Sequence, residues 1–426
     1  MTPVAMTWFW QGWLAAIVFI FPIPHTIALR NLLLLVGLMA VLATLRTRVR
    51  LQLPQKLKPA AWGLLATTAW LVFQSLVVAQ TPAVALDNLR GDWILPLLTA
   101  ALASFAAARA GPQQAIRATV AALVAHMLWV FGWQIWLLAF GGPLDNWSSG
   151  IVPFGERDYQ SSLNGFLFSI LLAERVAVKC FGTNAALASN KTGWMALAVS
   201  LIADASLRVR NGTIVNVVLL LVATVWMSRR QPRLIFLLLF VALLGGTSLA
   251  LDSRWSVLKE SLAIGWDTPN SYWMSGDQEI RPLTPSGADI DDSAYLRAAW
   301  AHKAVQAIGE HPLGLGFGRD GFGRAVERKY AFPGMVSSHS GWLDFALGAG
   351  LPGLALLLIT AGLAILGGWK QFQEHDDGVG LMFCFLISGY LLRCLLDGHL
   401  SGWRLGLFAF ICGVLIGTMK HPSRKV

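Results

Sequence analysis

The chain has 426 residues, of which 55% are apolar and only 13% are charged, and its mean hydropathy is +0.58. An ordinary soluble domain carries about 25% charged residues, so this composition predicts a protein with many membrane-spanning helices. The net charge of +10 does not indicate a nucleic-acid partner, because most positive residues lie in short loops between apolar runs. The four cysteines form no CxxC pair, so they indicate neither a metal site nor a disulfide framework.

Apolar runs long enough for membrane spans, which need about 17–25 residues each, occur along the whole chain. We predict an all-α polytopic membrane protein with about 12 transmembrane helices and one large, partly helical loop. The first run lacks a basic segment before it and an A-x-A site after it, so we interpret it as a retained span. Pro22 and Pro24 leave open that the first two runs form one broken helix. The runs are 6–21, 27–45, 60–80, 93–108, 118–140, 161–178, 185–203, 213–227, 234–251, 341–366, 379–396 and 403–419.

Lysines and arginines in the loops predict the orientation, because cytoplasmic loops hold an excess of them. With both chain ends inside, sixteen positive residues fall on the inner side and five in short outer loops. The expected organisation is nine spans in residues 1–252, an outer loop with amphipathic helices in residues 253–340, and three spans in residues 341–426. The five positive residues of the outer loops are Arg30, Arg90, Arg157, Arg208 and Arg210.

The orientation rule does not explain positive residues in the outer loops, so their presence there requires another explanation. Arg208 and Arg210 stand in one tight turn between two apolar runs, and arginine grips phosphate oxygens with two parallel hydrogen bonds. Binding of lipid headgroups is an alternative that explains Arg30 and Arg90 equally well. We therefore expect Arg208 and Arg210 to bind an anionic substrate, with Arg157 as a further candidate.

The outer loop contains a predicted amphipathic helix over residues 294–308, which follows the good capping residues Asp291, Asp292 and Ser293. This helix carries Arg297. Before it, residues 266–289 are expected to be irregular, and after it a short helix is expected over residues 323–330. The glycine-rich run 313–318 follows no strand, so we interpret it as a close-packing turn and not as a nucleotide site.

His339 joins the outer loop to the apolar run 341–366 and therefore lies at a membrane surface. A lone histidine is more often structural than catalytic, but Ser338 and Ser340 flank this one, and arginines recur on the same side of the membrane. Asp397 lies near the outer end of the eleventh run. Arginines can neutralise the charge that builds on a leaving diphosphate, and a histidine of near-neutral pKa can take a proton from an attacking hydroxyl. The pattern favours glycosyl transfer from a lipid carrier.

Three motifs strengthen this interpretation. The segment His339-Ser340-x-x-Leu343, followed by Gly350, resembles the H-[NS]-x-x-L-x6-G signature of the O-antigen ligase family. That family shares a domain with O-antigen polymerases and with some protein oligosaccharyltransferases. Upstream, Ser293, Arg297 and Trp300 resemble the family's Ser…Arg…Trp helix, and the segment from Glu310 to Gly316 resembles its HPxxGxG turn.

The family's other outer arginine usually follows Ser or Thr directly in a short turn. Here Arg208 follows Leu207 and Arg210 follows Val209. We assign the role to Arg210, because Asn211 and Gly212 come next, and leave Arg208 as the alternative.

The resemblance implies a donor polysaccharide on undecaprenyl diphosphate, a lipid A–core acceptor, and a site on the periplasmic side of the bacterial inner membrane. It also implies inversion at the donor's anomeric carbon, with no metal and no cofactor. Arg210 and Arg297 would hold the diphosphate with help from Arg208, and His339 would orient or deprotonate the acceptor hydroxyl. Asp397 would hold the working tautomer of His339 or serve only in helix packing.

Two other functions remain open from the sequence. The first is the same chemistry with another acceptor, in a polymerase or a protein O-oligosaccharyltransferase; the short remaining outer loops favour a ligase. The second is a transporter of an anion or a lipid. Transporters bury charge near the membrane midplane and show paired halves, and the sequence has little charge within its apolar runs and no convincing internal repeat.

Overall fold

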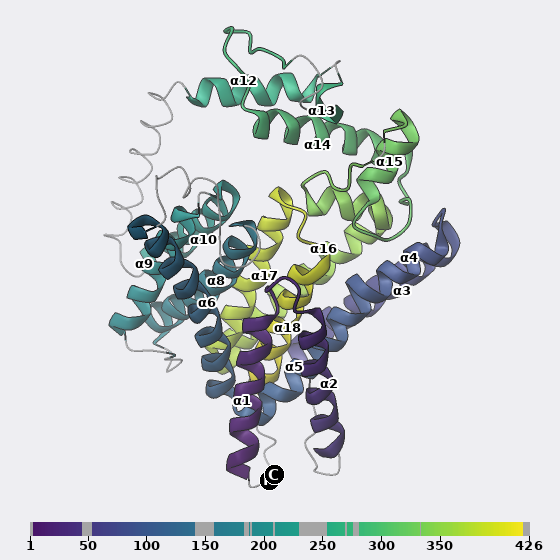
Figure 1. Cartoon of the computed structure of the whole chain (residues 1–426). Helices are drawn as coiled ribbons and strands as arrows, with labels where there is room; N and C mark the ends of the chain where they lie inside the picture. The colour runs from purple at the N-terminus through teal and green to yellow at the C-terminus, as the bar shows by residue number, and fades with distance from the viewer. Residues whose placement is uncertain are drawn as a thin grey trace.

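The computed structural model describes residues 3–44, 53–140, 157–182, 187, 190–207, 209–229, 254–268, 271–275, 281–332 and 334–420. Within these residues the regular structure is helical, and the one β-type contact is an isolated bridge between Leu283 and Asp289. The all-α class predicted from composition is therefore confirmed for the described part of the chain. Figure 1 shows a bundle of long helices with a layer of shorter helices across one end.

The bundle contains most of the helices, and two of them carry short 3-10 or π segments at their ends. These segments are η1 (Gln55–Leu57) and η2 (Gln74–Val78) on either side of α3, and η3 (Arg90–Ile94) between α4 and α5. The helices are α1 (Pro3–Ile20), α2 (Ile27–Thr44), α3 (Lys58–Phe73), α4 (Pro82–Leu89), α5 (Leu95–Ala110), α6 (Pro112–Phe140), α8 (Arg157–Phe181), α9 (Asn190–Ser206), α10 (Arg210–Ser228), α16 (Gly341–His375), α17 (Gly378–Leu396) and α18 (Gly402–Thr418).

Eleven of the twelve predicted spans coincide with these helices, and the remaining one, 234–251, lies outside the described residues. Seven helical segments among the described residues are long and apolar enough to cross a membrane, and α1 and α18 are apolar but shorter. The number of twelve spans stays a prediction. The seven segments are Ile27–Thr44, Gln55–Val78, Pro82–Ala110, Pro112–Leu137, Arg210–Ser228, Gly341–His375 and Gly378–Leu396.

Small residues bring the bundle helices together. A Cβ atom at Gly413 of α18 would lie 2.1 Å from the carbonyl oxygen of Ala100 in α5, and one at Gly417 would lie 2.1 Å from that of Ser104. Such close backbone approach is the usual way in which helices associate in lipid. Helix α8 is buried along most of its length between α9, α10 and α17, so its many polar residues face the protein interior.

The layer across the end of the bundle is formed by α12 (Arg254–Trp266), α13 (Tyr272–Ser275), α14 (Asp292–Glu310) and α15 (Gly321–Tyr330). It has its own hydrophobic core, in which Tyr295 of α14 and Phe322 of α15 pack with Leu347 of α16. The expected helices over 294–308 and 323–330 are confirmed with slightly wider bounds. Helix α12 was not predicted; it precedes the stretch 266–289 that we expected to be irregular. The first residues of α1 lie at the opposite end of the bundle (Figure 1).

The glycine-rich turn joins this layer to the bundle. Helix α16 breaks at Gly350, which adopts φ 77°, and the break leaves backbone carbonyls without helical partners. Leu315 N–H donates to the carbonyl of Leu347 at 2.8 Å and Gly316 N–H to that of Gly348 at 3.1 Å. The run 313–318 is thus the close-packing turn that the sequence indicated.

Candidate active site

Arg210 is the first residue of α10 and lies beside the start of α14. Its Nη1 is 3.1 Å from Oδ2 of Asp291. Asp291 is also the N-cap of α14, because its Oδ1 accepts the N–H of Ala294 at 3.0 Å. The carboxylate of Asp291 therefore has two contacts. It caps the helix that carries Arg297, and it holds the guanidinium of Arg210 beside the start of that helix.

His339 lies in the turn before α16, and its ring stacks on Trp300 of α14 with centroids 4.9 Å apart and planes 16° from parallel. Trp300 is three residues after Arg297, so the two side chains share one side of α14. The pKa of His339 lies below its ordinary value of 6.5, first because surrounding protein displaces water from the ring, and next because Arg297 is positive. The imidazole is therefore neutral at neutral pH and is able to accept a proton.

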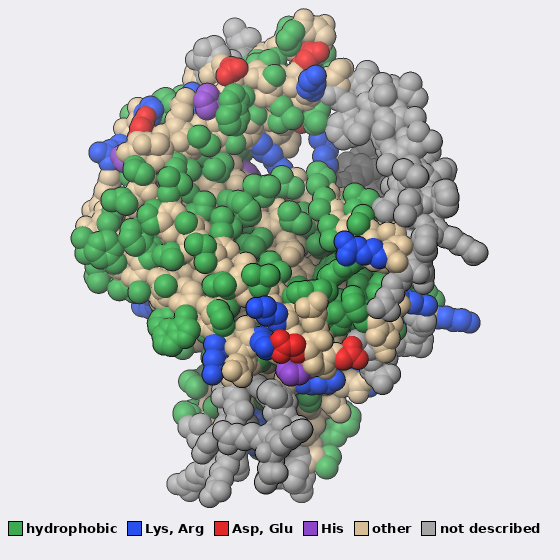
Figure 2. Space-filling view, turned by 180° about the vertical axis from the view of Figure 1, so that it is seen from behind, with side chains coloured by type: hydrophobic (Ala, Val, Ile, Leu, Met, Phe, Trp, Pro, Cys, Tyr) green, Lys and Arg blue, Asp and Glu red, His purple; other side chains and the backbone are tan. Residues whose placement is uncertain are grey.

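An opening separates the α12–α14 layer from the bundle, and Figure 2 shows Lys and Arg side chains along its edge. The side chains of Arg210 and Arg297 are 70% and 39% exposed. Both guanidinium groups are consequently accessible to an anionic ligand that enters between the layer and the bundle.

Asp397, at the end of α17, connects the three residues. Its Oδ1 accepts a hydrogen bond from Asn211, the neighbour of Arg210, at 2.7 Å, and lies 3.9 Å from Nη2 of Arg297. Its backbone oxygen accepts the N–H of Gly341 at 3.0 Å and so ties down the turn that carries His339. Its carboxylate contacts the two arginine-bearing elements, whereas its link to the His339 turn runs through the backbone.

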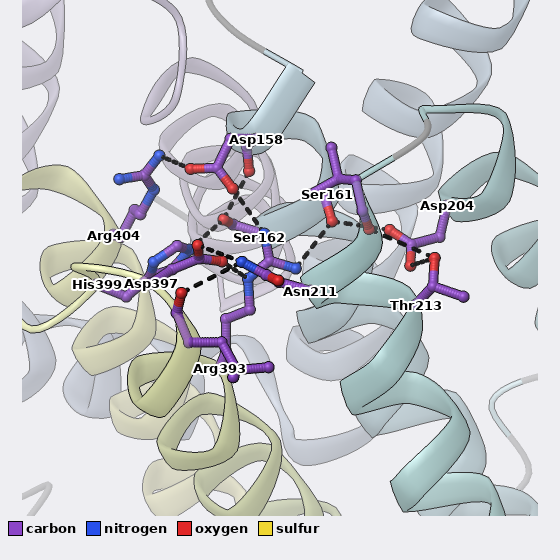
Figure 3. Close-up of polar contacts among 12 residues, drawn as sticks. Asp158, Ser161, Ser162, Asp204, Asn211, Thr213, Arg393, Asp397, His399 and Arg404 are labelled. Carbon is purple, nitrogen blue, oxygen red and sulfur yellow. Dashed lines mark hydrogen bonds and ion pairs between the residues drawn. The ribbon is translucent and has the colours of Figure 1, made fainter. Parts of the chain in front are cut away.

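Asp397 also belongs to a largely buried network of charged side chains (Figure 3). Arg393 of α17 is only 7% exposed, and its Nε is 2.5 Å from Oδ2 of Asp397 while its Nη2 is 2.6 Å from Oδ1 of Asp158. The other carboxylate oxygen of Asp158 pairs with Arg404 of α18. The network thus joins the start of α8, the end of α17 and the start of α18.

Three members of this region, Asp158, Asp397 and His399, present ligand atoms within 4.8 Å of one another and are the candidate metal ligands among the described residues. Both carboxylates are already paired with arginines. Burial, and after it the charges of Arg404 and Arg393, hold the pKa of His399 well below 6.5. A cation at this position would have to compete with two guanidinium groups. The donor set therefore suits an internal salt-bridge network better than a metal.

Residues 195–358, from within α9 to the middle of α16, match the family described as O-antigen ligase. The match covers 164 of the 426 residues. No curated protein matches the chain.

The matched region contains Arg210, Arg297 and His339, the three residues predicted to be catalytic. It does not contain Asp158 or Arg393, which come from helices on either side of it. The candidate site is therefore built partly by the matched region and partly by the helices that flank it in sequence.

The structure gives fewer contacts for the two remaining predicted arginines, Arg157 and Arg208. Arg157 is the first residue of α8 and directly precedes Asp158, which brings it to the same end of the bundle. Arg208 lies outside the described residues, so the choice between Arg208 and Arg210 stays a prediction. No observation tests the substrate-binding roles of these residues or of Asp397.

Apart from Asp397, sequence reasoning missed this buried network. Arg393 lies within the apolar run 379–396, and a charge in such a run is a recognised sign of a functional or structural pairing in membranes. Asp158, His399 and Arg404 carried no such sign, because each lies in or near a polar loop where charged residues are ordinary. Only the packing of α8 against α17 and α18 brings them together.

Proposed function

We propose that the protein is an O-antigen ligase, which transfers a polysaccharide from undecaprenyl diphosphate to a sugar of the lipid A–core. The reaction would take place on the periplasmic face of the bacterial inner membrane, without a metal or a cofactor. The observation that carries the proposal is the meeting of Arg210, Arg297 and His339 at the first turns of α14, all within the region that matches the O-antigen ligase family. The exposed apolar faces of α2 and α3 would contact membrane lipid.

In the proposed step, an acceptor hydroxyl oxygen attacks the anomeric carbon of the donor sugar. The new C–O bond forms as the bond from that carbon to the diphosphate oxygen breaks, which inverts the anomeric configuration. Undecaprenyl diphosphate leaves with the bonding electron pair. The hydroxyl proton passes to the neutral ring of His339 or, if His339 only orients the hydroxyl, to an oxygen of the leaving diphosphate. All atoms of donor and acceptor are accounted for without a further reactant.

The two exposed arginines would act on the leaving group. A guanidinium can hold diphosphate oxygens with two parallel hydrogen bonds, and it stays charged when partly desolvated. The negative charge on the diphosphate grows as the sugar departs, so fixed positive groups stabilise the transition state more than the bound donor. Arg297 would do this from α14 and Arg210 from α10, with Arg208 and Arg157 as additional contacts.

The position of Arg297 explains how base and cation work together. Burial first, and the charge of Arg297 next, lower the pKa of His339, so the ring is neutral before reaction. When the diphosphate binds, part of that positive charge is neutralised, and an imidazolium becomes easier to form. Donor binding would therefore raise the basicity of His339 at the moment when a proton has to be removed.

Reconstitution in lipid vesicles tests the proposal. Purified protein receives an undecaprenyl-diphosphate-linked glycan, with lipid A–core in one tube and no added acceptor in a second, and wild type is compared with His339→Ala. Transfer that requires both lipid A–core and His339, and that EDTA leaves unchanged, is the expected result. Lengthening of the glycan without lipid A–core would identify a polymerase, and no reaction in either tube would favour a transporter.

A further inference from the structure

His339 has an unusual backbone conformation. Its φ angle is 59°, in the left-handed region that residues other than glycine seldom adopt. Its N–H donates to the hydroxyl of Ser337 at 2.9 Å. Because the isolated residue would not favour this conformation, neighbouring groups have to impose it.

Asp344, in the first turn of α16, supplies the hydrogen bonds that close this conformation. Its Oδ1 accepts the N–H of Ser338 at 2.8 Å, and its own N–H donates to the carbonyl of Ser340 at 2.9 Å. The residue before His339 and the residue after it are thus both bonded to Asp344. The side chain is buried, with 6% exposure of the residue, so water does not compete for these bonds.

The loop after α17 forms the other side of the turn. Gly341 N–H donates to the carbonyl of Asp397 at 3.0 Å. A Cβ atom at Gly398 would lie 3.1 Å from the hydroxyl of Ser337 and 3.6 Å from Oδ2 of Asp344, so glycine allows this loop to close against the turn. The Asp344 carboxylate lies between the His339 turn and the loop that carries Asp397.

We infer that Asp344 is a positioning residue that fixes the His339 ring against Trp300 and beside Arg297. The inference rests on the proposed function, because it assigns Asp344 a part in the same reaction. Asp344 does not touch the substrate. Without its carboxylate, the Ser338 N–H is unpaired and the turn relaxes from the left-handed conformation, which moves the imidazole away from the acceptor hydroxyl.

If Asp344 only stabilised the fold, its removal would lower the melting temperature without a specific loss of kcat. The chain offers a matched control for this case. Asp377, the N-cap of α17 at the other end of the bundle, is also buried, and its carboxylate also accepts hydrogen bonds from backbone N–H groups. Its Oδ1 accepts from Val379 at 3.2 Å and its Oδ2 from Lys420 at 2.7 Å. Removal of the Asp377 carboxylate thus costs two such bonds and removal of the Asp344 carboxylate costs the one from Ser338, but only Asp344 lies at the candidate site.

The experiment compares kcat, donor KM and the melting temperature of Asp344→Ala, Asp344→Asn and Asp377→Ala in the vesicle assay. In Asp344→Ala we expect kcat to fall about 100-fold, the loss that misplacement of a catalytic group by about 1 Å produces, with donor KM unchanged. Asp344→Asn keeps an oxygen that can accept from Ser338 and should retain most of kcat. Asp377→Ala should melt at a lower temperature with kcat unchanged.

A second readout does not depend on transfer. The rate at which diethyl pyrocarbonate modifies His339, followed by mass spectrometry, should change several-fold in Asp344→Ala and stay at the wild-type value in Asp377→Ala. Where Asp344→Ala does not fold, Asp344→Ser, whose shorter hydroxyl cannot reach Ser338, replaces it.

Unchanged kcat and unchanged His339 reactivity in a folded Asp344 variant would overturn the inference. An equal loss of kcat in Asp377→Ala would do the same. Absence of transfer by the wild type would instead contradict the proposed function, and the modification rates would still report whether Asp344 positions His339.

Discussion

Two pairs of arginines meet at the same end of the bundle and differ in how their charge is matched. Arg210 and Arg297 have side chains 70% and 39% exposed, and their nearest carboxylate oxygens lie at 3.1 and 3.9 Å. Arg393 and Arg404 are 7% and 17% exposed and share the carboxylate of Asp158. The first pair is therefore open to solvent, whereas the second pair is largely enclosed by protein.

The difference shows which positive charge is available to a substrate. A solvent-exposed ion pair contributes only about 0–1 kcal/mol, so a diphosphate can replace Asp291 at Arg210 at little cost. A buried pair that loses one partner leaves an uncompensated charge, which costs about 3–5 kcal/mol. The buried arginines therefore hold the helices together, and the exposed arginines are the ones that can change partners during a reaction.

The buried pair provides the largest expected effect, on stability. Arg393→Leu leaves Asp397 and one oxygen of Asp158 without their guanidinium, so we expect a loss of about 3–5 kcal/mol in the free energy of unfolding. Thermal melting of the purified protein in detergent measures this. Arg393→Lys keeps a positive charge and should lose less. An unchanged melting temperature in Arg393→Leu would show that the buried network does not stabilise the fold.

The exposed pair should behave in the opposite way, with a loss of activity and no loss of stability. Arg297→Ala removes a positive group from the leaving diphosphate, and loss of one such stabilising contact reduces kcat about 100- to 1000-fold. Arg281→Ala is the matched control, because Arg281 belongs to the same layer, is 43% exposed and pairs with Asp292 at 2.8 Å. If Arg297→Ala transferred glycan at the wild-type rate, Arg297 would not bind the diphosphate as proposed.

A comparison within the exposed group decides between the two neighbouring arginines of the turn before α10. Arg210→Ala should reduce transfer about 10- to 100-fold, the equivalent of one charge-assisted hydrogen bond, and Arg208→Ala should reduce it less. The vesicle transfer assay measures both variants at one donor concentration below KM. The reverse order would show that Arg208 is the primary ligand of the diphosphate.

Local patterns in the sequence were sufficient to predict most of the helices and the exposed half of the site. The α14 helix followed from capping residues and apolar spacing, and the structure confirms Asp291 as its N-cap. The glycine-rich turn followed from the lack of a preceding strand. Arg297 and His339 followed from motifs of a few residues each.

The buried half of the site could not be predicted, because its bonds join residues far apart in the chain. Arg393 and Asp158 are 235 positions apart, and Asp397 and Asn211 are 186 apart. Asp344 was missed for another reason: it reads as an ordinary acidic residue in the first turn of a helix, where the helix dipole favours it. Only the backbone conformation of His339 shows what the hydrogen bonds of Asp344 do.

The smallest expected effect concerns pH and links the exposed arginine to the histidine. The pKa of His339 lies below 6.5, so the neutral, proton-accepting ring prevails at pH 7 and is lost as the pH falls through that lower value. Transfer by the wild type should therefore be level near pH 7 and decline only on the acid side of 6.5. Asp158 raises the pKa of the same ring, but its effect is smaller than that of Arg297.

Arg297→Gln removes the positive charge and should raise the pKa of His339, which moves the acid decline to higher pH. Because this variant transfers little glycan, the pH dependence is measured by the modification of His339 with diethyl pyrocarbonate, which reacts with the neutral ring. Arg281→Gln should leave the curve in place. Identical curves for wild type and Arg297→Gln would mean that burial alone sets the pKa, and that Arg297 acts on the diphosphate but not on the base.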